Sequence, residues 1–443
     1  MRLKDKKFFE LAKQNKFEAA DIFIHKHSAL SVSVFREKVD SLTENDNTLV
    51  TARGLVDGKF GSVTTEQIDK NTAEFLVNGI KRTAKVIENA DPAIIFKGSE
   101  KYHKKSVFVK ETLSNDIDGK IKLLLNIEKK LLAYDKRINE VVSVGYEENS
   151  SEEKLSNSYG LKLSQKQAEC SVFAEVTAKE GDEIRTGYHV FASLDFRDFD
   201  EDKFVEEVAK DALSKLGSTQ CKSKKYPVIL NPEAASTLIK YLINSADAEE
   251  IQKHSSRLEG KLHEQIVSKK LTITEDPLKK SIFFRYFDDE GVATQKRQII
   301  KKGVLETYLY TLQTAAIDNV EPTGNGYRGG GKAHADTSLV VVKPGRATEE
   351  ELMSSIEEGV YINNLEGLHA GMNAQSGNFS LQCSGFMIRN GKLAEPLSLI
   401  TVADNLFDMF NNVKAIGNNT KLVLRNGMEC PSLFIKKMAI SGK

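Results

Sequence analysis

The sequence has few of the features that mark membrane, secreted or nucleic-acid-binding proteins. Its 63 basic residues equal its 63 acidic residues, so no net charge attracts nucleic acid or an anionic membrane. No apolar run approaches the roughly 20 residues that a transmembrane helix needs. The charged N-terminal segment contains no apolar core of a signal peptide. We therefore expect a cytoplasmic protein that contacts no membrane and does not bind nucleic acid directly.

Cysteine and proline are also scarce. The cysteines are Cys170, Cys221, Cys383 and Cys430, and no two of them form a CxxC pair. Scattered cysteines predict reduced thiols rather than a disulfide framework or a cysteine zinc site. The 443 residues include only 8 prolines and no low-complexity tract, so no flexible linker is indicated. A chain of this length is long enough for two or three domains with full cores.

The N-terminal half mixes predicted strands with amphipathic helices. Alternating apolar residues predict strands near residues 21–25, 30–35 and 49–56, and a helix follows over residues 73–87. The same mixture then recurs. The second set has helices at 113–134 and 204–216, with strands near 141–146, 161–163, 170–177 and 186–193 between them. We expect two α+β units, residues 1–110 and 111–222.

The C-terminal half is dominated by strands. It opens with a buried strand at Val228–Leu230, and Asn231 and Pro232 then form a well-defined helix start. From Leu271 onward the predicted strands are 282–287, 298–300, 304–309, 339–342, 379–388 and 432–440. We expect a strand-rich C-terminal domain over residues 223–443. Strand-rich sheets with helices segregated among them indicate an α+β fold rather than a doubly wound one.

The last fifth of the chain is rich in glycine and asparagine between strand-like runs. Asn390-Gly391 is typical of a two-residue hairpin, because both central residues of a type I′ turn need positive φ. The segment from Gly367 to Asn378 is crowded with small and polar residues, a composition that lets backbone approach a ligand closely. The residues that we expect to bind peptide are His369, Asn373, Gly377, Asn378, Ser384 and Gly385.

Two motifs with cofactor or catalytic associations fail the test of context. The segment 324–329 fits GxGxxG, but Pro322 precedes it and a strand follows it, so a glycine loop is favoured over a dinucleotide site. His263-Glu264 resembles the start of a zinc-binding HExxH or HExxxH helix. The second histidine would fall on Val267 or Ser268, and neither side chain replaces imidazole. We interpret this segment as an exposed helix.

Other candidate ligands are dispersed along the chain. His25 and His27 share one face of a strand, with no third ligand nearby in the sequence. His334 and Asp336 lie two residues apart in a glycine-rich loop, where they either assist binding or are merely solvated. Cys383 alternates with apolar residues, which predicts packing rather than nucleophilic chemistry. The sequence contains neither a GxSxG elbow nor a P-loop.

An ordered set of landmarks resembles the PmbA/TldD family along nearly the whole chain. The landmarks are the early strands, Ser156–Gly160, the strand and helix after Pro227, Leu271–Ile273, Pro322–Gly324, Ser376–Ser380, Ser384–Gly391, Ile400–Leu406, Ile416–Asn418 and Cys430. Their order is similar to that of the PmbA branch, also called TldE. The resemblance implies a cytoplasmic proteolytic system that was historically named for modulating DNA gyrase.

In the TldD branch, the resemblance implies an HExxxH helix and a later cysteine that bind zinc. Here residues 239–244 of the helix that starts at Pro232 occupy the matching place, and their sequence is Ile-Lys-Tyr-Leu-Ile-Asn. No histidine occurs between Pro232 and Lys253, and Cys430 matches the later cysteine. One thiolate does not hold catalytic zinc alone. We therefore expect no zinc, no other cofactor and no catalytic residue in this chain.

Three functions follow from this resemblance. The first is a non-catalytic subunit that binds peptide or unfolded protein beside a TldD-type zinc subunit, and that can pair with itself when isolated. The second is a peptidase active on its own, with zinc ligands drawn from His334, Asp336, His369 and Cys430. The third is a non-enzymatic regulator of gyrase or of another client.

Overall fold

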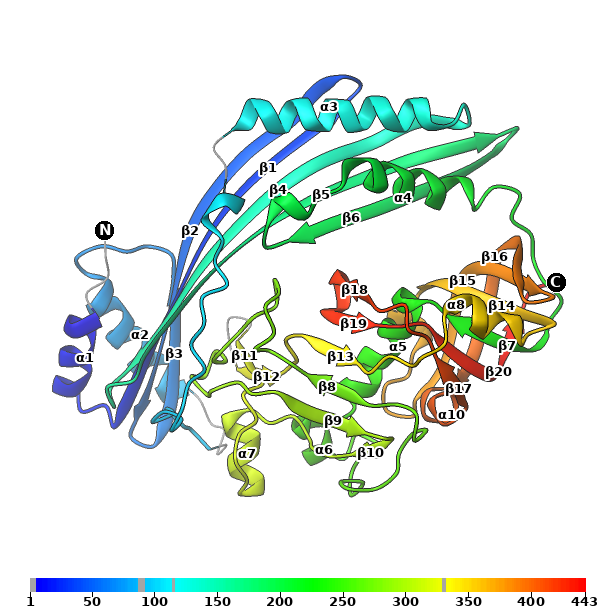
Figure 1. The fold of residues 1–443 in the computed structure, drawn as a ribbon. Helices are drawn as coiled ribbons and strands as arrows, with labels where there is room; N and C mark the ends of the chain where they lie inside the picture. Colours follow the sequence, from blue (N-terminus) through cyan, green and yellow to red (C-terminus); the bar gives the residue numbers. More distant parts are fainter. Residues whose placement is uncertain (1–4, 87–91, 114–115, 329–331) are drawn as a thin grey trace.

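The protein consists of a long arched sheet and a more compact C-terminal body, and the chain passes from one to the other at the end of the arch that lies away from α1 (Asp5–Gln14) and α2 (Thr72–Val86) (Figure 1). The computed structural model describes residues 5–86, 92–113, 116–328 and 332–443. The first described helix, residues 5–14, lies near one end of the arch, and the C-terminus lies on the C-terminal body (Figure 1). None of the helices in these ranges is both long and apolar enough to span a membrane.

The arched sheet is antiparallel and has six strands in the order β3-β2-β1-β4-β5-β6. Its strands are β1 (Ala19–Phe35), β2 (Lys38–Val56), β3 (Lys59–Thr65), β4 (Ile138–Asn157), β5 (Lys162–Glu180) and β6 (Glu183–Ser193). The strands expected from two separate units therefore share one sheet, because β1 pairs with β4 from Asp21 to Val34.

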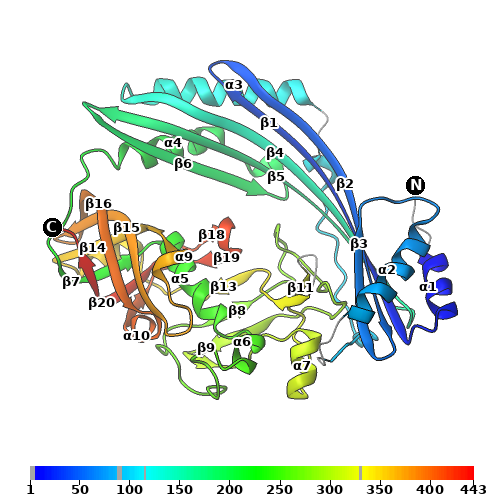
Figure 2. The ribbon, with the colours of Figure 1, turned by 180° about the vertical axis from the view of Figure 1, so that it is seen from behind.

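Helices cover one face of the arch. α1 (Asp5–Gln14) and α2 (Thr72–Val86) pack on one end, and α3 (Ile117–Tyr134) and α4 (Glu201–Leu213) pack side by side on the other (Figure 2). Even-numbered residues of β1 contribute to both cores, as expected when side chains alternate across a strand. The odd-numbered residues, among them His25 and His27, therefore face the other side of the sheet. The two imidazole rings lie 6.2 Å apart.

The C-terminal body contains two six-stranded sheets and a two-stranded ribbon. One sheet has the order β16-β15-β14-β7-β20-β17 and consists of β7 (Lys224–Leu230), β14 (Glu358–Glu366), β15 (Asn378–Arg389), β16 (Lys392–Asn405), β17 (Val413–Ile416) and β20 (Leu433–Ser441). The other has the order β10-β9-β8-β13-β19-β18 and consists of β8 (Ile273–Glu275), β9 (Arg297–Lys301), β10 (Val304–Leu305), β13 (Val340–Val342), β18 (Lys421–Val423) and β19 (Met428–Cys430). The ribbon pairs β11 (Gly326–Arg328) with β12 (Ala333–Ala335).

One core joins both of these sheets through a central helix. The helices of this body are α5 (Pro232–Asn244), α6 (Ala248–Gln252), α7 (Leu312–Asp318), α8 (Glu349–Ser354), α9 (Leu368–Gly371) and α10 (Leu406–Asn411). Short 3₁₀ helices are η1 (Lys110–Thr112), η2 (Phe196–Asp198) and η3 (Leu424–Asn426). As predicted, the Asn231 side chain caps α5 by accepting a hydrogen bond from the Ala234 N–H. Leu238 and Leu242 bury the apolar stripe of α5 in the shared core.

The α+β fold class is confirmed, but some local predictions are wrong. Residues 282–287 form turns rather than a strand, and the strand predicted at 304–309 ends at Leu305. His263 has a φ of 64° and lies in a turn, so the predicted exposed helix is absent there. The apolar run at 282–287 misled the prediction, because its side chains are buried by contact with the arch rather than within a sheet of their own.

The segment 282–290 joins the C-terminal body to the arch. Its aromatic residues Phe284, Tyr286 and Phe287 pack against Phe23 and Leu155 of the arched sheet. Beside them lies a buried ionic cluster. Arg53 on β2 pairs with Asp21 on β1, and Glu290 lies 3.7 Å from Arg53. Arg328 on β11 donates from Nη2 to Asp21 over 3.1 Å.

Burial would raise the pKa of Asp21, but the guanidinium groups of Arg328 and Arg53 outweigh it and hold that pKa below its usual value. The carboxylate therefore stays charged at the center of the junction.

Candidate functional site

A pocket of about 450 Å³ lies where α5, α6, β12 and the loop before β15 meet. It is lined by Lys240, Tyr241, Asn244, Ser245, Asp247, Glu250, Ser255, Ser256, Leu309, His334, Ala335, Asp336, Ala374 and Gln375. Charged, hydroxyl and amide side chains from four segments therefore converge on one concavity. This convergence makes the pocket our candidate site.

Helix α5 directs one polar face into this pocket. Its buried stripe faces the core, which leaves Lys240, Tyr241 and Asn244, spaced by one and three residues, on a common face toward the pocket. The Lys240 ammonium donates to Asp336 Oδ1 over 2.5 Å and to the Thr337 hydroxyl over 3.2 Å. A fixed cation therefore occupies the wall of the pocket that α5 forms.

The segment that carries Asp336 is held by a buried polar pair. Asn325 donates from Nδ2 to the Asp336 carbonyl over 2.8 Å and to both carboxylate oxygens of Glu275 over 3.0 and 2.9 Å. Glu275 is only 3% exposed. Burial raises its pKa to about 7, against the lowering effect of the hydrogen bonds from Asn325 and the Ser338 N–H. Glu275 thus positions the pocket wall without contacting the cavity.

Two carboxylates from α6 and the residue before it form an acidic wall of the pocket. Asp247 caps α6 by accepting a hydrogen bond from the Glu249 N–H over 2.9 Å. Burial raises the pKa of Asp247 to about 6. Glu250 accepts a hydrogen bond from the Ser255 hydroxyl over 2.6 Å. Carboxylates and an ammonium that line one cavity can bind opposite charges of one ligand, such as the polar groups of a peptide.

The predicted loop residues shape the pocket's rim rather than its lining. Asn373 and Asn378 close the loop through a backbone hydrogen bond of 2.9 Å, and Gly377 donates to the Asn373 carbonyl over 2.8 Å. This closure presents Ala374 and Gln375 to the cavity. Gly377 has a φ of 74°, and a Cβ there would lie 3.0 Å from the Phe407 ring. Gly377 is therefore a turn and packing residue.

The other predicted residues lie away from this pocket. His369 is exposed on the short helix α9. Ser384 and Gly385 lie in the middle of β15, where Gly385 pairs with residues of both β14 and β16. A Cβ at Gly385 would come within 1.8 Å of the Tyr361 carbonyl oxygen, so this glycine permits close strand packing.

Sequence reasoning did not identify the residues that line the acidic wall. Asp247 and Glu250 follow α5 in an ordinary charged segment, and no motif distinguishes them. Lys240 entered the sequence analysis only as the residue at the place of the glutamate in the HExxxH helix that the resemblance implies. Two signals in the sequence pointed to this pocket: the position of α5 in the resemblance, and the His334–Asp336 pair, because both residues of that pair line the cavity.

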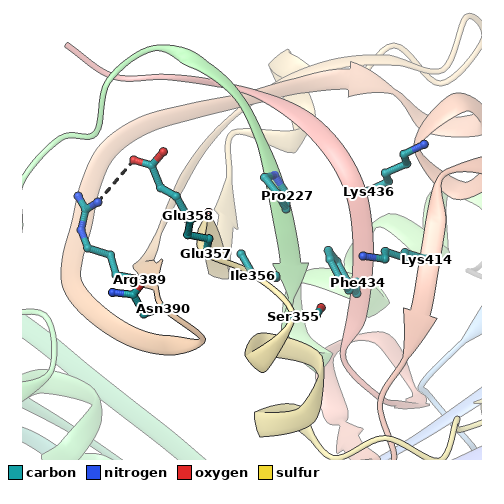
Figure 3. Close-up of a pocket in the computed structure, with 10 residues that line it drawn as sticks. All are labelled: Pro227, Ser355, Ile356, Glu357, Glu358, Arg389, Asn390, Lys414, Phe434 and Lys436. Atoms are coloured by element: carbon teal, nitrogen blue, oxygen red, sulfur yellow. Dashed lines mark hydrogen bonds and ion pairs between the residues drawn. The ribbon is translucent and has the colours of Figure 1, made fainter.

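A second concavity, of about 880 Å³, lies at the end of the β7, β14 and β20 strands (Figure 3). Its floor is formed by Pro227, Ile356 and Phe434, and the charged groups stand around the rim. Arg389 lies 3.5 Å from Glu358 across one side (Figure 3). These rim charges are exposed and do not converge on a point. The smaller pocket beside α5 is therefore the better candidate for chemistry or recognition.

The pocket residues do not fit a zinc ion. Within the described residues, no group of three or more His, Cys, Asp or Glu side chains could hold a metal. An ammonium such as Lys240 has no lone pair to donate. Cys430 is fully buried, its Sγ lies 3.4 Å from the Pro431 carbonyl, and burial raises the pKa of its thiol. This thiol lies in the core, whereas His369 is exposed on α9.

The comparisons with known proteins agree along most of the chain. Three domains of the PmbA/TldA metallopeptidases match: domain 1 over residues 20–90, the central domain over 110–216 and the C-terminal domain over 223–442. Among curated proteins, the metalloprotease PmbA homolog of Buchnera aphidicola is 26% identical, covering 96% of this chain and 93% of that protein. The metalloprotease PmbA of Escherichia coli O157:H7 is 28% identical, covering 74% of this chain and 70% of that protein.

Solved structures show the same similarity. A candidate modulator of a DNA gyrase from Thermotoga maritima superposes with a TM-score of 0.90 at 28% identity, covering 99% of both chains. TldE from Thermococcus kodakarensis superposes with a TM-score of 0.91 at 21% identity, covering 99% of this chain and 100% of that one, and shares the fold. From these domain matches, the chain belongs to the PmbA/TldA metallopeptidase family.

Proposed function

We propose that this chain is the peptide-binding, non-catalytic subunit of a cytoplasmic protease whose zinc is carried by a TldD-type partner. The observation that carries the proposal is the wall of the pocket formed by α5. In a family of metallopeptidases, this wall presents Lys240 paired with Asp336, and the described residues offer no set of three metal ligands. A chain that has the family's fold but lacks a set of metal ligands is suited to be a non-catalytic subunit.

The pocket itself supports a role in binding. The carboxylates of Asp247 and Glu250 line the same cavity as the Lys240 ammonium, so an extended peptide finds partners for both amine and carbonyl groups. The loop between Met372 and Asn378 adds small side chains, which leave backbone groups accessible. In this proposal the substrate is a peptide or an unfolded protein.

The first experiment separates this proposal from a peptidase active on its own. The purified chain is analysed for zinc and incubated with unfolded peptides, first alone and then with a TldD-type chain. We expect no stoichiometric zinc and no cleavage from the chain alone, and a stable complex with chelator-sensitive cleavage from the mixture. About one zinc per isolated chain together with chelator-sensitive activity would contradict the proposal, because that is what a catalytic site requires.

A second experiment tests the pocket. Ala374→Trp places a bulky ring at the exposed rim, and Ala133→Trp places the same ring on an exposed position at the end of α3. We expect the complex to form with both variants. Cleavage by the complex should fall at least about ten-fold with Ala374→Trp, a loss of about 1.4 kcal/mol, and stay unchanged with Ala133→Trp. Equal cleavage by the two variant complexes would exclude this pocket as the peptide-binding site. If this chain and the TldD-type chain do not associate, the result would favour a regulator.

A further inference from the structure

A third concavity, of about 490 Å³, lies on the C-terminal body and is surrounded by lysines. These are Lys269, Lys270, Lys301, Lys302 and Lys343, and all five residues are exposed. The other described residues that line it are uncharged. No described residue forms an ion pair with these lysines or accepts a hydrogen bond from their ammonium groups. In a chain with a formal net charge of zero, this concavity is therefore a local positive field.

The topology of one sheet brings these lysines together. Strands β9, β8 and β13 are neighbours with alternating directions, so the end of β9, the start of β8 and the end of β13 meet at one end of the sheet (Figure 1). Lys301 ends β9, and Lys343 directly follows β13. The two outer strands stand two strand spacings apart, which is roughly 10 Å. A small ligand between them therefore reaches lysines from both sides.

The backbone between these lysines is already fixed. The Lys343 N–H donates to the Thr272 carbonyl over 3.0 Å, and the Lys302 N–H donates to the Thr272 hydroxyl oxygen over 3.0 Å. The Gly303 N–H donates to the Leu271 carbonyl over 2.8 Å. A ligand would therefore order only the lysine side chains, which limits the entropy lost on binding.

The ordinary roles of surface lysines do not explain this cluster. Lysines along the free edge of a sheet protect it from pairing, but Lys269, Lys270 and Lys343 lie outside the strands. Lysines that keep a surface soluble are best interspersed with acidic residues, and none of the described lining residues is acidic. Five like charges around one hollow repel each other, and a bound anion would offset that repulsion.

The lining favours a compact anion with several charges over a macromolecule. Lysine binds phosphate as a point charge, so five ammonium groups suit several linked phosphates. An extended acidic peptide turns successive carboxylates to opposite sides, so carboxylates on one side stand roughly 7 Å apart. A protein that binds duplex DNA contacts about 6 to 10 phosphates along the backbone, whereas these lysines gather around one hollow. No described aromatic residue lines the hollow, so no base can stack there.

We propose that this concavity binds a small polyanion of linked phosphate groups, either an inorganic oligophosphate or the triphosphate of a nucleotide. Lys301 and Lys343 contact the phosphates from two sides. The amide of Gln298 lines the same hollow without a partner among the described residues, and it donates a further hydrogen bond. This concavity shares no lining residue with the pocket beside α5, so the proposal does not rest on peptide binding.

Isothermal titration calorimetry on the full chain tests the ligand class. The ligands are tripolyphosphate, ATP without divalent cations, and orthophosphate. We expect tripolyphosphate and ATP to bind at least about ten-fold more tightly than orthophosphate, and both to weaken as salt rises from about 50 to about 200 mM, because salt screens exposed charges. Tighter binding of ATP would identify a nucleotide as the ligand, and tighter binding of tripolyphosphate would identify an inorganic oligophosphate.

Two double variants test the site. Lys301→Gln with Lys343→Gln removes one charge from each side of the hollow. Lys104→Gln with Lys105→Gln is the matched control, because it removes two exposed lysine charges elsewhere in the chain. We expect tripolyphosphate to bind about ten-fold more weakly to the first variant and equally well to the second. Denaturant unfolding without ligand should show that both variants are folded.

Three results would overturn the proposal. The first is a wild type that does not bind tripolyphosphate. The second is an equal loss of affinity in both double variants, which would show that only the net charge of the chain matters. The third is binding confined to duplex DNA or to an acidic peptide and lost in Lys301→Gln with Lys343→Gln, which would assign the concavity to that macromolecule.

Discussion

At the scale of single residues, Glu275 links the candidate site to pH. Burial raises its pKa to about 7 in the folded chain from an ordinary 4.5. Between about pH 4.5 and 7 the folded chain therefore keeps a proton that the unfolded chain has released. The contribution of Glu275 to the free energy of unfolding is fully present below about pH 4.5. It is lost as the pH rises through 7, by on the order of 3 kcal/mol.

Glu275→Gln should remove most of this dependence. A glutamine oxygen can still accept from Asn325 and the Ser338 N–H, but no charge develops at high pH. We expect the variant to match the wild type near pH 4.5 and to be more stable at pH 8, as measured by denaturant unfolding at each pH. Some slope should remain, because burial also raises the pKa of Asp288 to about 7. Parallel curves for the two proteins would contradict the assignment.

The sequence predicted the local environment of single residues better than it predicted which residues line the candidate site. Cys383 is buried in the core as its alternation indicated, and the Asn231 cap is in place. Lys240 and Asp247 were not predicted as pocket residues, because their convergence with Asp336 depends on contacts between segments far apart in the chain. Side chains of ordinary composition become a site only through such contacts, which no local pattern encodes.

At the scale of elements, two hairpins share one turn geometry but differ in their surroundings. Asn390 and Gly391 have φ values of 50° and 78°, and Asp57 and Gly58 have φ values of 51° and 70°. Both turns have the positive φ values that the sequence predicts. A Cβ added at Gly391 would lie 2.8 Å from Ser354 Cα, whereas a Cβ at Gly58 would meet open space.

Alanine at the two glycines should therefore have unequal effects. Gly58→Ala should destabilise by about 1 kcal/mol, the cost of a left-handed conformation. Gly391→Ala should cost about 1–3 kcal/mol more, because α8 must shift to accept the methyl group. Denaturant unfolding of both variants measures the difference. Equal losses would show that the hairpin of β15 and β16 moves away from α8 without cost.

Elements with strong local signals were the most predictable ones. The arched strands and their hairpins follow from alternation and turn residues. The predicted strand at 282–287 is an apolar run without alternation, and it forms turns, because its aromatic side chains are buried against another sheet rather than within one. The part of the predicted glycine loop at residues 329–331 lies outside the described residues, and so does residue 87 of the predicted helix. The boundaries at 110/111 and 222/223 stay predictions.

At the scale of the whole molecule, the arch and the C-terminal body depend on one buried junction. Asp21 is the shared acceptor for Arg53 of the arch and Arg328 of the C-terminal body, and all three side chains are buried. Arg328 Nε and Nη1 have no other partner among the described residues. Removing the charge of Asp21 would leave two buried guanidinium groups close together, with the carboxylates of Glu290, Asp288 and Asp289 as their remaining counter-charges.

Asp21→Asn should therefore destabilise the chain by about 3 kcal/mol or more, because breaking a buried ion pair leaves a charge without compensation. Asp135→Asn is the matched control: its exposed pair with Arg137 should contribute nothing measurable. Denaturant unfolding gives the total loss, and hydrogen exchange locates it. We expect faster exchange in β1, in β2 and around residues 282–290, with the shared core of α5 unchanged. A uniform rise in exchange across the whole chain would instead show that the two bodies unfold as one unit. An unchanged stability would show that the remaining carboxylates, Glu290, Asp288 and Asp289, neutralise both arginines.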